Sequence, residues 1–291
     1  MSAGPFDIRE VEAAIAGTEF AGHLRHLSSV PSTNDLALAA AQAGARSGIW
    51  IADEQTAGRG RGAHRWHSTL GATQEPAGLY MSALVAPSIP LQSALRLSLR
   101  VAIAVQSAIA SVAGFRIREE IDIRWPNDLL LKGRKCGGIL IETSAQRSPS
   151  VPSSPAPAML RHAVIGIGVN VNITSFPPEL EPIATSLRRE MPDPSQLLRR
   201  EPLVAAILVS LDKELRALTT SNQQPATSNF AEYSSWISGR RVRIEARDPT
   251  PSDPTPGYTG ITAGLDPQGF LLVAGDDGQV HTVLSGGLRE P

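Results

Sequence analysis

The sequence predicts an α+β protein with a smaller β domain at its C-terminus. Three observations support this prediction. The 291 residues, 42% of them hydrophobic, suffice for a sizeable core and one or two domains. Up to about residue 235, strand-like stretches are interspersed with stretches that have helical spacing. From about Trp236 the pattern changes to short β runs between Gly/Asp turns, which indicates a small β-barrel over 236–291 after a larger domain over 1–235.

The first third of the chain predicts helices and strands in alternation. Residues 7–17 have the pattern of a short amphipathic helix closed by Gly17, and 23–30 that of a strand. Residues 32–44 predict a helix that Ser32, Thr33 or Asn34 can cap and Gly44 ends. The sequence also predicts strands at 47–56 and 79–86 and a buried, Ala-rich helix at 91–114.

The middle of the chain is rich in strands. Residues 121–125 alternate like a strand, and 126–143 and 162–172 are strand-rich pieces punctuated by glycine. The Ser/Pro/Ala-rich stretch 144–158 between them cannot build a core, so we expect an extended surface insert. Residues 197–218 predict a helical region that Pro202 breaks in two.

Composition excludes several classes of protein. A net charge of −1 gives no general attraction to nucleic acid or membrane. We expect no apolar run to be long enough to cross a bilayer. A single cysteine, Cys136, rules out an intrachain disulfide. The N-terminus lacks the pattern of a secretory signal, so a reduced cytoplasmic setting is expected.

The stretch "EQTAGRGRGAHRWHS", residues 54–68, concentrates glycine and arginine around one tryptophan. Its glycines let the backbone come close to a ligand, and its arginines offer forked donors for phosphate or carboxylate. The stretch is not a P-loop, because the closing Gly-Lys-Ser/Thr is missing. A solvated hairpin loop with incidental arginines is the alternative.

A second motif is "RWPNDLLLKGRKCGGILIE", residues 124–142. Pro126 ends a strand, after which Asn127 and Asp128 lie at a turn, and Lys135 follows on a hairpin. A plain Asx-turn and a surface lysine are the simpler interpretations of these residues. We expect Trp125 and Cys136 to pack in the core.

Four motifs in order resemble the biotin protein ligase family. They are "STN" at 32–34, "QTAGRGRGAHRW" at 55–66, the motif at 124–142, and "IGIGVNVN" at 165–172 together with "ATSL" at 184–187. The C-terminal part resembles the family's SH3-like domain. The resemblance implies a mixed, largely antiparallel sheet backed by helices, as in class II aminoacyl-tRNA synthetases. The family loop usually has a third arginine where this chain has His64, so that role is not carried over, and Arg65 is left as a substitute.

The resemblance implies a two-step reaction. Biotin and ATP, with Mg²⁺ on the polyphosphate, would give biotinyl-5′-AMP, and the biotinyl group would pass to a lysine of a biotin carboxyl carrier protein. The glycine/arginine loop would close over both substrates as a lid. Only 31 residues precede the first motif, too few for the DNA-binding domain of some members, so no DNA binding is expected. The oligomeric state stays open, although family members are often dimers.

The resemblance also assigns residues. Ser32, Thr33 and Gln55 would bind biotin, with Asn34 in the same segment capping the helix. Arg59, Gly60 and Arg61 would contact the biotin carboxylate and the adenylate phosphate, and Lys135 would bridge them. The residues placed around ATP or the adenylate are Arg61, Trp66, Asn127, Asp128 and Asn170, with Asp128 orienting the acceptor lysine or a metal. A lipoate or octanoate ligase is the first alternative, and a nucleic-acid-binding module that uses the loop is the second.

Overall fold

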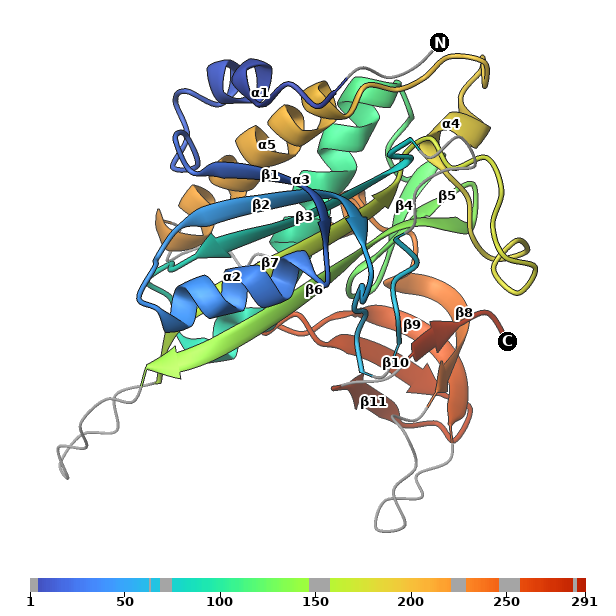
Figure 1. Ribbon diagram of the computed structural model, residues 1–291. Coiled ribbons are helices and arrows are strands. Elements are labelled where there is room, and N and C mark those ends of the chain that lie inside the picture. Colours follow the sequence, from blue (N-terminus) through green and yellow to red (C-terminus); the bar gives the residue numbers. More distant parts are fainter. Residues whose placement is uncertain are drawn as a thin grey trace, which may run out of the picture.

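A seven-stranded mixed sheet forms the centre of the molecule (Figure 1). The computed structural model describes residues 5–62, 64–68, 75–146, 158–220, 229–245, 257–284 and 287–291. The strands are β1 (Leu24–Val30), β2 (Gly48–Gln55), β3 (Gly78–Val85), β4 (Ile121–Arg124), β5 (Asp128–Leu131), β6 (Arg134–Gln146) and β7 (Met159–Asn170). Their order is β1-β2-β3-β7-β6-β5-β4, with β1 and β2 parallel and every other pair antiparallel. The mixed, largely antiparallel sheet is thus confirmed.

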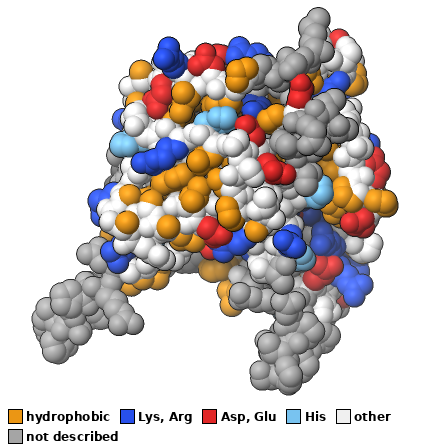
Figure 2. All heavy atoms as spheres, in the orientation of Figure 1, with side chains coloured by type: hydrophobic (Ala, Val, Ile, Leu, Met, Phe, Trp, Pro, Cys, Tyr) orange, Lys and Arg blue, Asp and Glu red, His pale blue; other side chains and the backbone are white. Residues whose placement is uncertain are grey.

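Helices cover both faces of this sheet. One face is apolar and packs against α3 (Ala94–Ala113) and α5 (Arg200–Thr220), with α1 (Ile8–Ala14) beside α5. The other face is covered by α2 (Thr33–Gln42), which packs on Trp50, Leu84 and Val164. Figure 2 shows the apolar side chains that gather on this second face. Shorter helical segments are α4 (Leu187–Glu190) and the 3₁₀ turns η1 (Leu91–Ser93) and η2 (Phe230–Glu232).

The C-terminal residues form a separate antiparallel sheet. Its strands are β8 (Ser238–Glu245), β9 (Tyr258–Leu265), β10 (Leu271–Gly275), β11 (Val280–Val283) and β12 (Gly287–Arg289), in the order β11-β10-β9-β8-β12. Trp125 fastens this sheet to the larger one, because its Nε1 donates to the carbonyl oxygen of Gly269 at 3.0 Å. Ser235 Oγ also donates to Asp122 at 2.5 Å. Trp125 and Cys136 are both buried, as predicted.

Several local predictions were wrong. Ser32 caps α2 by accepting from the Asp35 N–H, so Asn34 is not the cap but lies inside the helix. Pro202 does not divide a helix, because it lies in the first turn of α5, where its missing N–H would have no helical partner. The first residues of the expected insert, Ser144–Gln146, continue β6, and 147–157 lie outside the described residues.

The longest apolar run is also longer than expected. Leu91–Ala113 is long and apolar enough to cross a membrane by length and composition, contrary to the prediction that no run is. In the structure 56% of its membrane-length window is buried inside the protein. Packing against the sheet and α5 therefore accounts for its apolar composition.

Candidate functional site

The predicted site residues meet on the face of the sheet that α2 covers. Strand alternation places Ser82, Leu140 and Glu142 on this face together with Gly138, Gly166 and Gly168, because the register pairs Gly138 with Gly168 and both Leu140 and Ser82 with Gly166. A Cβ on Gly168 would lie 2.6 Å from the Trp66 indole, and one on Gly138 would lie 3.1 Å from it. Gly138 and Gly168, named here the glycine shelf, therefore let Trp66 lie directly on the backbone of the sheet.

A chain of hydrogen bonds connects the start of α2 to the end of β2. The Thr33 N–H donates to Gln55 Oε1 at 2.9 Å, and Gln55 Nε2 donates to Ser68 Oγ at 3.0 Å. Ser82 Oγ lies 2.7 Å from Thr33 Oγ1 and donates to Asn34 Oδ1 at 2.6 Å. Ser32, Thr33 and Asn34 are all buried. The structure thus brings together the four residues predicted around biotin and adds Ser68 and Ser82.

The glycine/arginine segment forms a paired hairpin between β2 and β3. The N–H of Gln55 donates to the Ser68 carbonyl, that of Trp66 to Gly58, and that of Gly60 to His64. Gly58 has no room for a side chain, since a Cβ there would lie 2.6 Å from the Trp66 carbonyl oxygen. Gly62, at the tip, has a positive φ of 68°. The described residues of the segment predicted to act as a lid therefore form a hairpin with paired arms.

Arg59 anchors this hairpin to the sheet and to α2. Its Nη2 donates to Glu142 Oε2 at 2.6 Å and lies 2.9 Å from Asp35 Oδ1. Glu142 also accepts from Asn34 Nδ2 at 2.8 Å. Glu142 therefore links the α2 segment to the arginine loop through two hydrogen bonds from different elements.

Trp66 lies next to the predicted catalytic cation. Lys135 Nζ is 5.5 Å from the centroid of the Trp66 ring. Trp66 Nε1 is buried and has no hydrogen-bond partner among the described residues. Because a buried polar group normally finds a partner, this N–H is a candidate donor to a ligand.

Two cations flank Asp128. Lys135 Nζ donates to its Oδ1 at 2.5 Å, and Arg124 Nη2 donates to its Oδ2 at 2.6 Å. Burial raises the pKa of Asp128, but Lys135 and Arg124 outweigh burial and hold the pKa below its usual value. Asp128 is therefore ionised at neutral pH and fixes the Lys135 ammonium in position. Neighbouring Asn127 donates its side-chain N–H to the Ile139 carbonyl at 2.6 Å, which ties the turn to β6.

The segment "ATSL" lies against Lys135 through its backbone. The Lys135 N–H donates to the Ile183 carbonyl at 2.8 Å, and the Thr185 N–H donates to the Lys135 carbonyl at 2.9 Å. Asn170 donates its side-chain N–H to the Thr185 carbonyl at 2.9 Å. Asn170 is buried and holds this segment in place, and this bond uses one of its two side-chain N–H groups.

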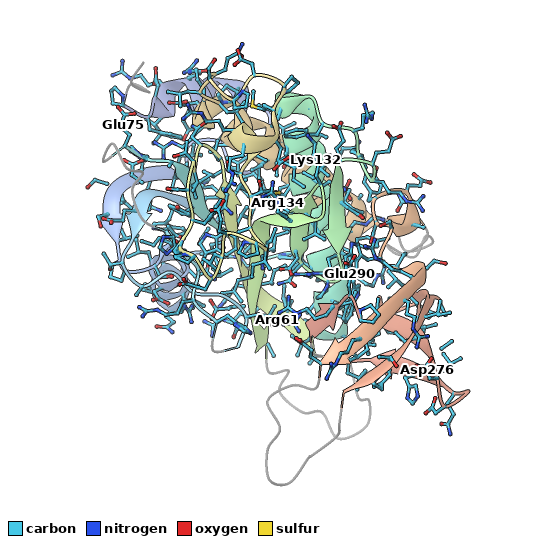
Figure 3. All side chains as sticks on the ribbon, turned by 90° about the vertical axis from the view of Figure 1, so that its right-hand side faces the viewer. Arg61, Glu75, Lys132, Arg134, Asp276 and Glu290 are labelled. Carbon is cyan, nitrogen blue, oxygen red and sulfur yellow. The ribbon has the colours of Figure 1, made fainter. Side chains whose placement is uncertain are left out.

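Lys132 is in a different environment from Lys135. It lies in the turn between β5 and β6 with a φ of 48°, so strand alternation does not relate its orientation to that of Lys135. Its Nζ donates to the Glu190 carbonyl at 3.1 Å and lies 3.6 Å from Glu190 Oε2. Arg134 bonds the same carboxylate, and Figure 3 labels Lys132 and Arg134 together with Arg61 at the loop.

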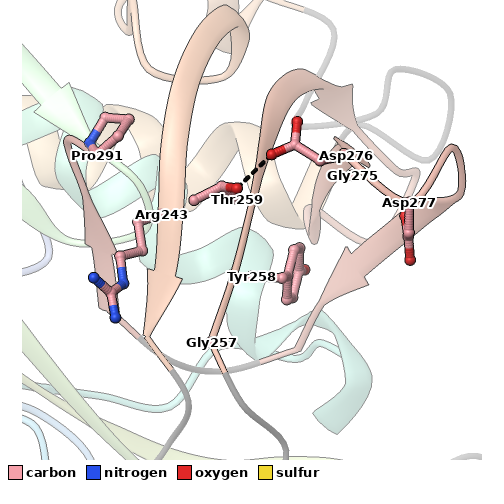
Figure 4. Close-up of a pocket in the computed structure, with 8 residues that line it drawn as sticks. All are labelled: Arg243, Gly257, Tyr258, Thr259, Gly275, Asp276, Asp277 and Pro291. Atoms are coloured by element: carbon pink, nitrogen blue, oxygen red, sulfur yellow. Dashed lines mark hydrogen bonds between the residues drawn. The ribbon is translucent and has the colours of Figure 1, made fainter.

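The remaining thiol, the hollow on the C-terminal sheet and possible metal ligands are weaker candidates for a functional site. Burial raises the pKa of the Cys136 thiol to about 12, so this thiol is a poor nucleophile. A hollow of about 420 Å³ on the C-terminal sheet is lined by Arg243, Tyr258 and Asp276, among others (Figure 4). Asp276 is occupied there by Thr259 and Arg241, and no predicted site residue reaches this hollow. The described residues contain no group of three His, Cys, Asp or Glu side chains that could hold a metal.

The sequence did not indicate Ser68, Ser82 and Glu142, which the structure places at the site. Ser68 and Glu142 lie within motifs that drew notice for glycine and cationic residues, and Ser82 lies in an otherwise apolar strand. Strand parity could have indicated Glu142, because it shares a face with Gly138. No signal in the sequence pairs Ser82 with α2.

Comparisons with known proteins give the family and the fold. Residues 27–170 match the model of the biotin/lipoate A/B protein ligase family. The chain is 35% identical over 265 residues to the bifunctional ligase/repressor BirA of Bacillus spizizenii, covering 90% of this chain and 72% of that protein. It is 31% identical over 262 residues to the biotin--[acetyl-CoA-carboxylase] ligase of Mycobacterium tuberculosis, covering 88% and 84%. The biotin protein ligase of Aquifex aeolicus, solved with biotin and ATP, has the same fold, with a TM-score of 0.68 at 22% identity over 93% of this chain and all of that one.

Proposed function

The chain belongs to the biotin protein ligase family, and from this premise we propose that it converts biotin and ATP into biotinyl-5′-AMP and then transfers the biotinyl group to a lysine of a biotin carboxyl carrier protein. One observation carries the proposal. The Trp66 indole and the Lys135 ammonium lie side by side over the glycine shelf, between the α2 segment and the arginine hairpin. An aromatic face, a fixed cation and forked donors together suit a ligand with a ring system and adjoining anionic groups.

In the first step an oxygen of the biotin carboxylate attacks the α-phosphorus of ATP, and pyrophosphate leaves. Attack of one anion on another is opposed electrostatically, so preorganised cations lower the barrier. We assign this role to Lys135, with Arg59, Gly60 and Arg61 closing over the carboxylate and phosphate. Asp128 supports Lys135 by holding its ammonium at 2.5 Å.

The biotin head group is assigned to the polar chain at the start of α2. A ureido ring needs donors and acceptors at its edges, and Ser32, Thr33 and Gln55 offer both kinds. Asn34 acts in this scheme through Glu142 and Ser82. We propose that Trp66 faces the adenylate, while Asn127 and Asn170 shape its site through the backbone groups they bind.

Mg²⁺ fits this site as part of the nucleotide substrate. Both oxygens of Asp128 already accept from cations, which makes this carboxylate a poor resident ligand for a metal. We therefore propose that Mg²⁺ enters on the polyphosphate of ATP, where it neutralises charge.

The remaining proposals concern the whole protein. We propose a catalytic domain over 1–235 and a C-terminal domain over 236–291. ATP as substrate and a single buried cysteine support a cytoplasmic location. A homodimer follows only from the family, and sedimentation with and without biotin tests it.

The proposed reaction is tested with purified protein, ATP, Mg²⁺ and a biotin carboxyl carrier domain. Pyrophosphate release reports the first step, and a carrier mass increase of one biotinyl group reports the second. Lipoate replaces biotin in a parallel reaction. Activity with lipoate and none with biotin would favour the lipoate ligase alternative.

A further inference from the structure

Lysine is rare in this chain. Of its 27 basic residues only Lys132, Lys135 and Lys213 are lysines, and all the others are arginines. This matters for an enzyme that makes an acyl-adenylate, because the mixed anhydride reacts with any accessible amine. The inference below therefore rests on the proposed function.

Arginine and lysine differ sharply as acyl acceptors. A nitrogen attacks a carbonyl carbon only through a free lone pair, so the neutral form is needed. From ordinary pKa values near 10.4 and at least 12.5, lysine is neutral at least about 100 times more often than arginine at a given pH. An arginine can thus supply positive charge beside a reactive acyl group without being acylated itself.

The three lysines are placed where acylation is hindered. Lys135 must give up its 2.5 Å contact with Asp128 before its nitrogen can attack. Lys132 is held by the carbonyl and carboxylate of Glu190. Lys213 is exposed but lies on α5, which packs on the face of the sheet opposite the site.

The other cations near the site are arginines. Arg59, Arg61 and Arg65 belong to the hairpin, and Arg124 and Arg134 flank Asp128 and Lys135 in sequence. Each could be a lysine by charge alone. Arginine at these positions supplies positive charge to the site without adding an amine that biotinyl-AMP could acylate.

We propose that arginine in place of lysine around the site makes this ligase refractory to acylation by its own adenylate, so that the acyl group reaches a lysine presented by a partner. The excluded reaction is aminolysis. An amine nitrogen bonds to the carbonyl carbon of biotinyl-AMP, the bond from that carbon to the phosphate oxygen breaks, AMP leaves with the electron pair, and the amine loses a proton to water.

Position 64 offers a matched test. His64 is exposed at the hairpin tip, beside Arg61. His64→Lys and His64→Arg add the same charge to the same place and differ in nucleophilicity. Arg9→Lys, on exposed α1, gives a new lysine far from the site. Each full-length protein is incubated with biotin, ATP and Mg²⁺ without carrier, and peptide mapping by mass spectrometry locates the biotin.

We expect at least about 100-fold more biotin at position 64 in His64→Lys than in His64→Arg. Labelling by a succinimidyl ester of biotin, added without ATP, gives the intrinsic reactivity of each lysine. Relative to that reactivity, position 64 should exceed position 9 and Lys213 by about tenfold or more, as effective concentration near the site predicts. The inference is overturned if position 64 is labelled no more than position 9, or if the wild type labels itself at Lys132 or Lys135. Pyrophosphate release in every sample shows separately whether adenylate forms, so its loss would count against the proposed function instead.

Discussion

Replacing Lys135 by alanine should slow both half-reactions while the fold survives. One preorganised donor of this kind contributes roughly 10²–10³ in rate, or about 2.7–4 kcal/mol. The ammonium would serve the carboxylate and the phosphate in the first step and the departing phosphate in the second. Biotin-dependent pyrophosphate exchange measures the first half-reaction, and transfer from supplied biotinyl-AMP measures the second.

The structure adds a stability effect to this prediction. Lys135→Ala leaves Asp128 with Arg124 alone. The Lys135 and Asp128 side chains are 34% and 20% exposed, between a surface and a buried pair, so we expect a loss of about 1–2 kcal/mol. At about 2–4 °C per kcal/mol, the melting temperature should fall by about 2–8 °C.

The pH dependence of that loss identifies its source. The pKa of Asp128 is lowered in the folded state, so the stability it contributes is present above the unfolded pKa near 4 and is lost as pH falls through the folded value. The stability difference between wild type and Lys135→Ala should therefore be full at pH 7 and shrink below about pH 4. A difference that stayed constant down to pH 3 would show that Asp128 is not the partner that matters.

Two further variants separate catalysis from stability. Lys135→Arg keeps a cation beside Asp128 and should therefore restore the melting temperature. It should restore only part of the rate, because the guanidinium group of arginine is larger than the ammonium group of lysine. Lys132→Ala should keep a near-normal rate, since Lys132 bonds Glu190 and not Asp128. Near wild-type rates for Lys135→Ala in both assays, or a damaged Lys132→Ala, would refute the placement of the catalytic cation.

Three other predictions concern the loop and the partners. Arg59→Ala or Arg61→Ala should release biotinyl-AMP, and His64→Arg should increase the retention of biotinyl-AMP. Mass spectrometry of free biotinyl-AMP measures both effects. Full retention by Arg61→Ala would contradict the assignment of the hairpin as a lid. Glu142→Gln removes the negative charge that holds Arg59 at 2.6 Å. We expect it to raise KM for biotin about 2–5-fold with a smaller change in kcat. An unchanged KM would show that Glu142 does not position Arg59. The protein should not bind DNA specifically, and a salt-resistant, sequence-dependent gel shift in the nanomolar range on the organism's own biotin operon promoter would disprove this.

The sheet and its helices could be predicted because their signals are local. Alternation marked β4, and Gly44 marked the end of α2 with a positive φ of 98°. The wrong predictions arose where one residue or segment is compatible with two structural roles. Pro202 reads as a helix breaker, yet in the first turn it costs no hydrogen bond. Leu91–Ala113 is as apolar as a membrane helix because both a bilayer and a protein core select for that composition.

The candidate site was predictable only as separate motifs. Spacing along the chain could not show that Arg59 meets Glu142, 83 residues away, or that Asn34 meets the same carboxylate across 108 residues. These pairings depend on β6 lying two strands from β3 in the sheet, with β7 between them, an order that no local pattern encodes.

The position of Glu142 explains why so small a loop needs so much positive charge. Arg59 is held by two carboxylates, Glu142 and Asp35, so part of the charge of the hairpin is neutralised by the protein itself. A ligand that brings a carboxylate and phosphates must therefore find further cations, and Arg61 lies on the hairpin and Lys135 on β6. In the proposed function, Arg59 anchors the hairpin through its acidic partners, and Arg61 and Lys135 are the cations assigned to the substrate. This division predicts unequal effects: loss of the Arg59 anchor should weaken biotin binding as well as retention of the adenylate, whereas loss of Arg61 should chiefly affect retention of the adenylate.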